Sequence, residues 1–105
     1  MTQYILLIQG NAKSKSTTED WDQFFTAARQ SGSFEGGSAI GKRAVLGDTQ
    51  SAKSSEHIVG YMRFDSEDKQ KLLDLLKRHP VVMHGGSVEL REMPKSSRGL
   101  TIRRG

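Results

Sequence analysis

Cysteine is absent from this 105-residue sequence, and proline occurs only twice. The lack of cysteine excludes a disulfide-stabilised scaffold, a thiolate metal site and a cysteine nucleophile. Long apolar runs are also missing: the longest, residues 4–8, has the length of a strand, whereas a bilayer span needs ~18 apolar residues. No leader pattern of positive charge, apolar stretch and small residues follows Met1. We therefore expect a single soluble, cytoplasmic domain with no membrane partner.

Net charge is low outside the last residues of the chain. The formal charge is +4, and the segment after Pro94 carries Lys95, Arg98, Arg103 and Arg104 without an acidic residue. Subtracting these four from sixteen basic residues leaves twelve, which balance the twelve acidic residues of 1–94. We predict a folded domain over residues 1–94 and a basic flexible tail over 95–105. The alternative role of the tail is to bind phosphates or an acidic partner surface. Nucleic acid is a disfavoured partner, because such binding normally needs a basic face on the fold itself.

Four segments have strand patterns. Residues 3–9 and 57–64 are apolar on both alternating faces, which is typical of central strands. Residues 38–46 have a weaker pattern that indicates an edge strand, irregular near Gly41, and residues 87–93 alternate as a half-exposed strand. Residues 48–56 have the composition of a loop.

Two segments are predicted to be helices. The first, residues 18–31, follows a capping-box pattern formed by Ser16 and Glu19. Its apolar residues recur at helical spacing, and they are Trp21, Phe24, Phe25 and Ala28. The second helix begins after Asp65 or Ser66 and is stopped by Pro80. His79, just before that proline, is expected to act as a favourable C-terminal charge on the helix dipole.

The order strand, helix, strand, strand, helix, strand predicts an α+β ferredoxin-like βαββαβ sandwich. Both helices then cover one face of the sheet, and the two doubly apolar strands lie in its middle. The uncovered face is expected to present Tyr4 or its neighbours, Val59, Tyr61 and Val88. Because such a patch is large for a monomer, we expect a homodimer packed sheet to sheet as a dimeric α+β barrel, with a small-molecule pocket at the subunit seam.

Candidate functional residues follow from this arrangement. His57 and His79 are the candidate catalytic residues, as general acid or base. Arg63, Tyr61, Tyr4 and Arg91 are the candidate ligand-binding residues, and the arginines suit a small anionic ligand. An exposed ion pair is the alternative role for each arginine, and it is the favoured one for Arg91, between two glutamates.

The sequence predicts no metal site and no cofactor. His79 and His84 are separated by Pro80 and do not form the pair of histidines that presents two imidazoles to zinc. The same strand order also occurs in RNA-recognition domains, which need paired outward aromatics on the third strand. Tyr61 and Phe64 lie an odd number of residues apart and so face opposite ways, which disfavours that function.

Several short motifs together resemble the YCII-related domain family, close to its DGPF-containing branch. They are residues 4–8, the Trp21 helix ending at Gly32, Gly36-Gly37, residues 58–61, His79-Pro80 and residues 86–92. The resemblance implies a ferredoxin-like fold that dimerises into an α+β barrel, in a largely uncharacterised family where some members use a His–Asp pair. The Asp-Gly-Pro-Phe signature is absent, and Trp21 stands where the helix histidine is expected. An indole cannot exchange protons as imidazole does, so the family's chemistry does not carry over. Trp21 is therefore interpreted as a core aromatic.

Overall fold

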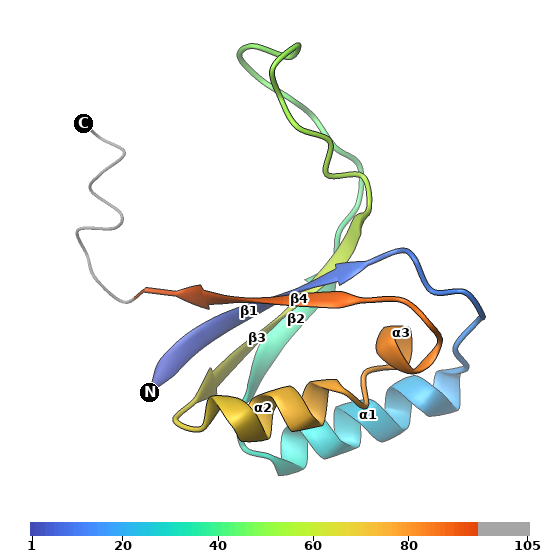
Figure 1. Cartoon of the computed structure of the whole chain (residues 1–105), viewed down its shortest axis with the longest axis vertical. Coiled ribbons are helices and arrows are strands. Elements are labelled where there is room, and N and C mark those ends of the chain that lie inside the picture. Colours follow the sequence, from blue (N-terminus) through green and yellow to red (C-terminus); the bar gives the residue numbers. More distant parts are fainter. Residues whose placement is uncertain (95–105) are drawn as a thin grey trace.

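The computed structural model describes residues 1–94 of the chain as an antiparallel sheet with helices on one face (Figure 1). The elements are β1 (Thr2–Gln9), α1 (Thr18–Gln30), β2 (Phe34–Ala39), β3 (Ile58–Ser66), α2 (Lys69–Leu76), α3 (Pro80–Met83) and β4 (Val88–Met93). The strand order is β2-β3-β1-β4, and each neighbouring pair is antiparallel. This is the arrangement of a ferredoxin-like α+β fold, as predicted. The predicted tail, 95–105, lies outside the described residues.

The two central strands were predicted correctly, because both are apolar on both faces. Leu6 and Ile8 of β1 and Met62 and Phe64 of β3 point toward the helices and are buried. Tyr4 belongs to this same row and is only 4% exposed, so its predicted place on the open face is wrong. The reason is the period of two along the strand, which puts Tyr4 with the buried residues and leaves its neighbours to the open face.

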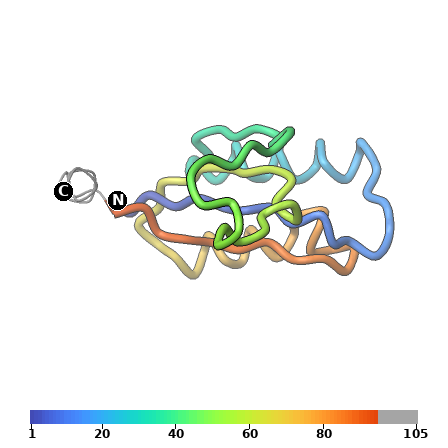
Figure 2. Tube along the Cα trace, turned by 90° about the horizontal axis from the view of Figure 1, so that it is seen from above, coloured from blue at the N-terminus to red at the C-terminus, as the bar shows by residue number. Residues whose placement is uncertain are grey.

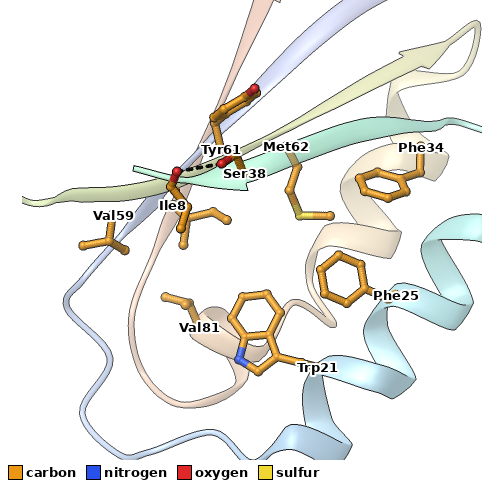
Figure 3. A pocket seen from close by; sticks show the side chains of 12 residues that line it. Ile8, Trp21, Phe25, Phe34, Ser38, Val59, Tyr61, Met62 and Val81 are labelled. Carbon is orange, nitrogen blue, oxygen red and sulfur yellow. Dashed lines mark hydrogen bonds between the residues drawn. The ribbon is translucent and has the colours of Figure 1, made fainter. Parts of the chain in front are cut away.

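A β-bulge changes the direction of one side chain in β3. Ile8 pairs with Gly60 and Gln9 pairs with Ile58, so Val59 has no partner on β1. Its side chain points to the helix side (Figure 3) and not to the open face, where it was predicted. Val88 was also predicted on the open face, but it pairs with Ile8 and packs against the core.

The N-cap of the first helix is Thr17, one residue after the Ser16 that the sequence indicated. Its hydroxyl accepts from the backbone N–H of Asp20 at 3.1 Å, and the Asp20 carboxylate accepts from the Thr17 N–H at 2.9 Å. Ser16 instead accepts a hydrogen bond from Trp21. Two overlapping capping-box patterns occur here, and the second one is used.

Strand β2 begins at Phe34, so the prediction of an edge strand over residues 38–46 is wrong by several residues. Phe34 pairs with Phe64 and anchors the strand to the core, and the bulge lies between Phe34 and Gly36. At Gly37 any Cβ would overlap the Tyr61 carbonyl, so glycine permits a close approach of the two backbones. Residues 40–57 form a long loop that extends away from the helices (Figure 1) and lies in front of the other elements when the molecule is seen from above (Figure 2).

The predicted second helix, expected to begin after Asp65 or Ser66 and to end at Pro80, is shorter than predicted, and a short helix follows it where none was expected. Asp68 caps α2, which ends at Leu76, and Pro80 then opens the short α3. Proline at a first helical position needs no N–H partner, so Pro80 starts a helix here instead of stopping one. Within residues 1–94, no helix is both long and apolar enough to cross a membrane.

Candidate functional site

An apolar cavity of about 350 Å³ lies between the sheet and the helices, on the helix side of β2 and β3 (Figure 3). Trp21 and Phe25 of α1 form one wall and Val81 of α3 closes one side. The sheet side is lined by Ile8, Phe34, Gly37, Ser38, Ala39, Val59, Gly60, Tyr61 and Met62. An engineered cavity of about 150 Å³ is large enough for benzene, so this one has room for two fused rings.

No acidic or basic side chain lines the cavity, and its two hydroxyl-bearing side chains turn away from it. Tyr61 and Ser38 point to the opposite side of the sheet (Figure 3), and the Ser38 hydroxyl donates to the Ala39 carbonyl at 2.8 Å. The interior is therefore apolar and aromatic. A ligand would be held there by contact area and ring packing and not by ion pairing.

The orientation of Trp21 is fixed by a hydrogen bond and by ring packing. Its Nε1 donates to the Ser16 hydroxyl at 2.9 Å, and its ring centroid lies 5.8 Å from that of Phe25. Trp21 is half-buried and packs against the core, which agrees with its interpretation as a packed aromatic. It is also a wall of the cavity, which the sequence did not indicate.

His79 is completely buried behind this wall. Its Nδ1 accepts from the Val81 N–H at 3.1 Å, so it caps α3. Its ring lies edge-on to Trp21 and Phe24, with centroids 5.0 and 4.8 Å apart. Nε2 has no hydrogen-bond partner among the described residues. Burial lowers the pKa of His79 to about 4, so the ring is neutral at physiological pH, and its predicted role as a helix-terminal charge is wrong.

A second polar group joins three segments that lie far apart in the sequence. The Ser14 hydroxyl lies 2.8 Å from Nδ1 of His84, and Nε2 of His84 lies 3.0 Å from Oδ2 of Asp20. The side chains of His84 and Asp20 are 24% and 39% exposed. Hydrogen bonds from the Thr17 N–H and from His84 lower the pKa of Asp20, so the carboxylate is ionised. In the sequence, His84 stands out only as a candidate zinc ligand and is not connected with Ser14 or Asp20.

The other predicted site residues do not come together around one cavity. His57 lies exposed in the turn before β3 and not on the strand, and its carbonyl accepts from Gly10 at 2.8 Å. Arg63 is exposed and donates to the Glu35 carbonyl at 3.3 Å. Arg91 forms an ion pair with Glu89 at 3.1 Å, in agreement with its favoured role. Tyr61 is half-buried on the open face.

Metal binding finds little support in the part of the chain that the structure describes. No three side chains of the His, Cys, Asp or Glu type gather there. Asp20 and His84 are a pair without a third ligand.

No protein-family model and no curated protein matches this chain.

Proposed function

We propose that the domain binds a small, neutral, aromatic molecule in the cavity between α1 and the sheet. The observation that carries this proposal is the lining: aromatic and aliphatic side chains border about 350 Å³ that is open on one side, without a single acidic or basic one. Rings pack well against rings, and Trp21 and Phe25 present theirs to the cavity (Figure 3).

The same lining argues against a charged ligand in this cavity. A carboxylate moved from water into an apolar site without a partner pays a desolvation cost of several kcal/mol. The sequence predicted an anionic ligand held by Arg63 at a subunit seam. Arg63 pairs with Ile5 across the sheet and lies on the open face, so that prediction concerns a different surface from the cavity.

The experiment compares 2-naphthol with 2-naphthoate, two molecules of similar shape that differ in charge at neutral pH. We expect naphthol to bind at least about tenfold more tightly, measured by isothermal titration calorimetry. Trp21 is the only tryptophan, so its indole N–H gives one side-chain NMR signal that reports on the cavity wall. That signal should shift with naphthol.

A variant pair tests the location. Val59 lines the cavity and is 44% exposed, so Val59→Phe should fill the space without disturbing the core and abolish naphthol binding. Leu46→Phe, on the loop at a site 92% exposed, is the matched control and should bind as the parent does. Equal affinity for naphthoate, or unchanged binding in Val59→Phe, would contradict the proposal.

We also propose that a second copy covers the open face of the sheet. The centre of that face is apolar, with Ile5 and Leu7 of β1 beside Tyr61 of β3, all three half-buried. Arg91 and Glu89 of β4 flank it. An apolar centre with a charged rim is the composition that an interface between two copies requires. The ferredoxin-like strand order also supports our proposal that the chain is a YCII-related domain.

A further inference from the structure

The hydrogen-bonded group of Ser14, His84 and Asp20 is not used by the proposed binding function. A serine, an imidazole and a carboxylate in series form the arrangement by which unrelated proteins activate a serine oxygen. We propose that Ser14 is a nucleophile activated by His84 and Asp20, and that it accepts the acyl group of small uncharged esters. This inference does not depend on ligand binding in the aromatic cavity.

The two contacts of His84 define the position of its proton. An ionised carboxylate can only accept, so the Asp20 contact places the hydrogen of the neutral ring on Nε2. Nδ1 then has a free lone pair, and at 2.8 Å it accepts the hydroxyl proton of Ser14. With a neutral ring, the hydrogen bond to Asp20 therefore selects the tautomer that a general base requires. The two ring nitrogens are exchanged relative to the chymotrypsin-type triad, but the roles are the same.

The segments that carry the three residues are held in place by further contacts. The carbonyl of His84 accepts from the N–H of Lys13 at 2.8 Å and of Ser14 at 3.3 Å. Asp20 is oriented by the capping box with Thr17. Because these contacts fix His84 and Asp20 independently of the Ser14 hydroxyl, the base is already positioned beside the nucleophile before a substrate binds.

A second cavity is lined by the base and the carboxylate of the relay, and Ser14 lies exposed next to the base, outside this lining. This cavity of about 310 Å³ is bounded by Asp20, Gln23, Phe24, Arg78, Pro80, Met83 and His84. Its lining includes the carboxylate of Asp20 and the guanidinium of Arg78, whose charges cancel, so the cavity has no net preference for a charged ester of either sign. This composition favours an uncharged acyl group.

The proposed step conserves atoms and charge. The Ser14 oxygen forms a bond to the acyl carbon while its proton passes to Nδ1 of His84. The bond between the acyl carbon and the leaving oxygen then breaks, and the alcohol or phenol leaves with that proton. Water returns the enzyme to its starting state by the same route, releasing the carboxylic acid.

The experiment exposes the full-length protein to p-nitrophenyl acetate. Release of p-nitrophenolate is followed by absorbance, and peptide mass mapping locates the acetyl group. We expect acetylation of Ser14 at a rate at least about 100-fold above that of Ser51, an exposed serine in the same sample whose hydroxyl contacts the carbonyl and the carboxylate of Asp48 but no histidine. Ser51 is thus an internal reference for a hydroxyl without an imidazole partner.

Variants distinguish activation of Ser14 from hydrogen bonding that only holds the three segments together. His84→Gln can still hydrogen-bond to Asp20 but cannot accept the proton, and Asp20→Asn favours the wrong tautomer. Both should lower the Ser14 rate to that of Ser51, while circular dichroism checks the fold. Ser14→Ala, in an exposed loop, serves if the others do not fold, and should remove the fast phase of p-nitrophenolate release. Equal rates at the two serines, acetylation of Ser14 unaffected by His84→Gln, or no acetylation would each overturn the proposal.

Discussion

The protonation state and the role of His79 are determined by contacts from another part of the chain. Trp21 and Phe24 of α1 pack on its ring, and the Val81 N–H occupies its only acceptor nitrogen. Protonation would break that hydrogen bond and place a charge in the core. The neutral ring is therefore a structural component, and His79 can act as an acid or base only if the core opens.

Stability should consequently depend on pH through His79. Its pKa is about 4 when folded and 6.5 in the unfolded chain, so the unfolded state binds more protons between these values. The contribution is complete above pH 6.5 and is lost as the pH falls toward 4, by roughly 3 kcal/mol at most. Urea unfolding at pH 7 and pH 4.5 measures the difference.

The matched variants are His79→Asn and His57→Asn. Asparagine at residue 79 retains a side-chain acceptor for the α3 cap but does not titrate, so the pH dependence between 6.5 and 4 should flatten even though the protein is less stable. His57 is exposed, and its variant should keep the parental slope. A parental slope in His79→Asn would contradict the assignment. Asp20 and Asp48, with lowered pKa values, act below this window.

At the scale of elements, the short-range sequence pattern predicted most helices and strands, whereas features set by long-range strand pairing were missed. Alternation and helical spacing correctly predicted β1, β3 and α1, because each buries a regular set of apolar side chains. These patterns gave wrong predictions at three places. The bulge in β3 reverses the direction of the Val59 side chain, the pairing of Phe34 with Phe64 sets the start of β2, and Pro80 begins a helix instead of ending one. None of these can be deduced from periodicity, since each depends on a partner strand or on where the preceding helix ends.

The turn between α3 and β4 is packed too tightly to accept a side chain at Gly86. A Cβ at Gly86 would lie 2.7 Å from Val81 Cγ1, 2.7 Å from Asn11 Oδ1 and 2.8 Å from the backbone nitrogen of Ala12. Gly86→Ala should therefore destabilise the fold by about 1–3 kcal/mol, measured by thermal or urea unfolding. Gly41→Ala is the control, because nothing lies within 4 Å of its Cβ, and it should be neutral or slightly stabilising. Equal stability of the two variants would show that the turn can relax.

At the scale of the whole molecule, single functional residues could be identified from the sequence, but the groups that they form could not. Residue type alone identified Trp21 and the histidines as notable, but the cavity and the Ser14–His84–Asp20 relay are assembled from separate segments. Asp20 and His84 are 64 residues apart, and Ser14 and His84 are 70 apart. Without the fold, no spacing in the sequence distinguishes these pairs from any other serine, histidine and aspartate. The cavity was missed for the same reason, since its walls come from three strands and two helices.

The proposed dimer is tested on the intact chain by light scattering after size-exclusion chromatography. We expect a molar mass twice the 11.7 kDa of one chain. Leu7→Glu, at the centre of the open face, should reduce the mass to that of a monomer because two like charges would meet in a desolvated interface. Met83→Glu, at a site 68% exposed on α3, is the control and should stay dimeric. A parent protein of 11.7 kDa at micromolar concentration would contradict the proposal.

The edge position of β2 has a consequence for how the molecule opens. This strand pairs only with β3 among the described residues, is mostly exposed, and is followed by the long loop of residues 40–57. Closing that loop costs entropy before any β2 contact forms, and few buried side chains compensate for it. The amides of β2 should thus exchange with deuterium before those of β1 and β3. Since Phe34 and Gly37 of β2 line the aromatic cavity, each such fluctuation removes one of its walls and gives a molecule from solution a way in.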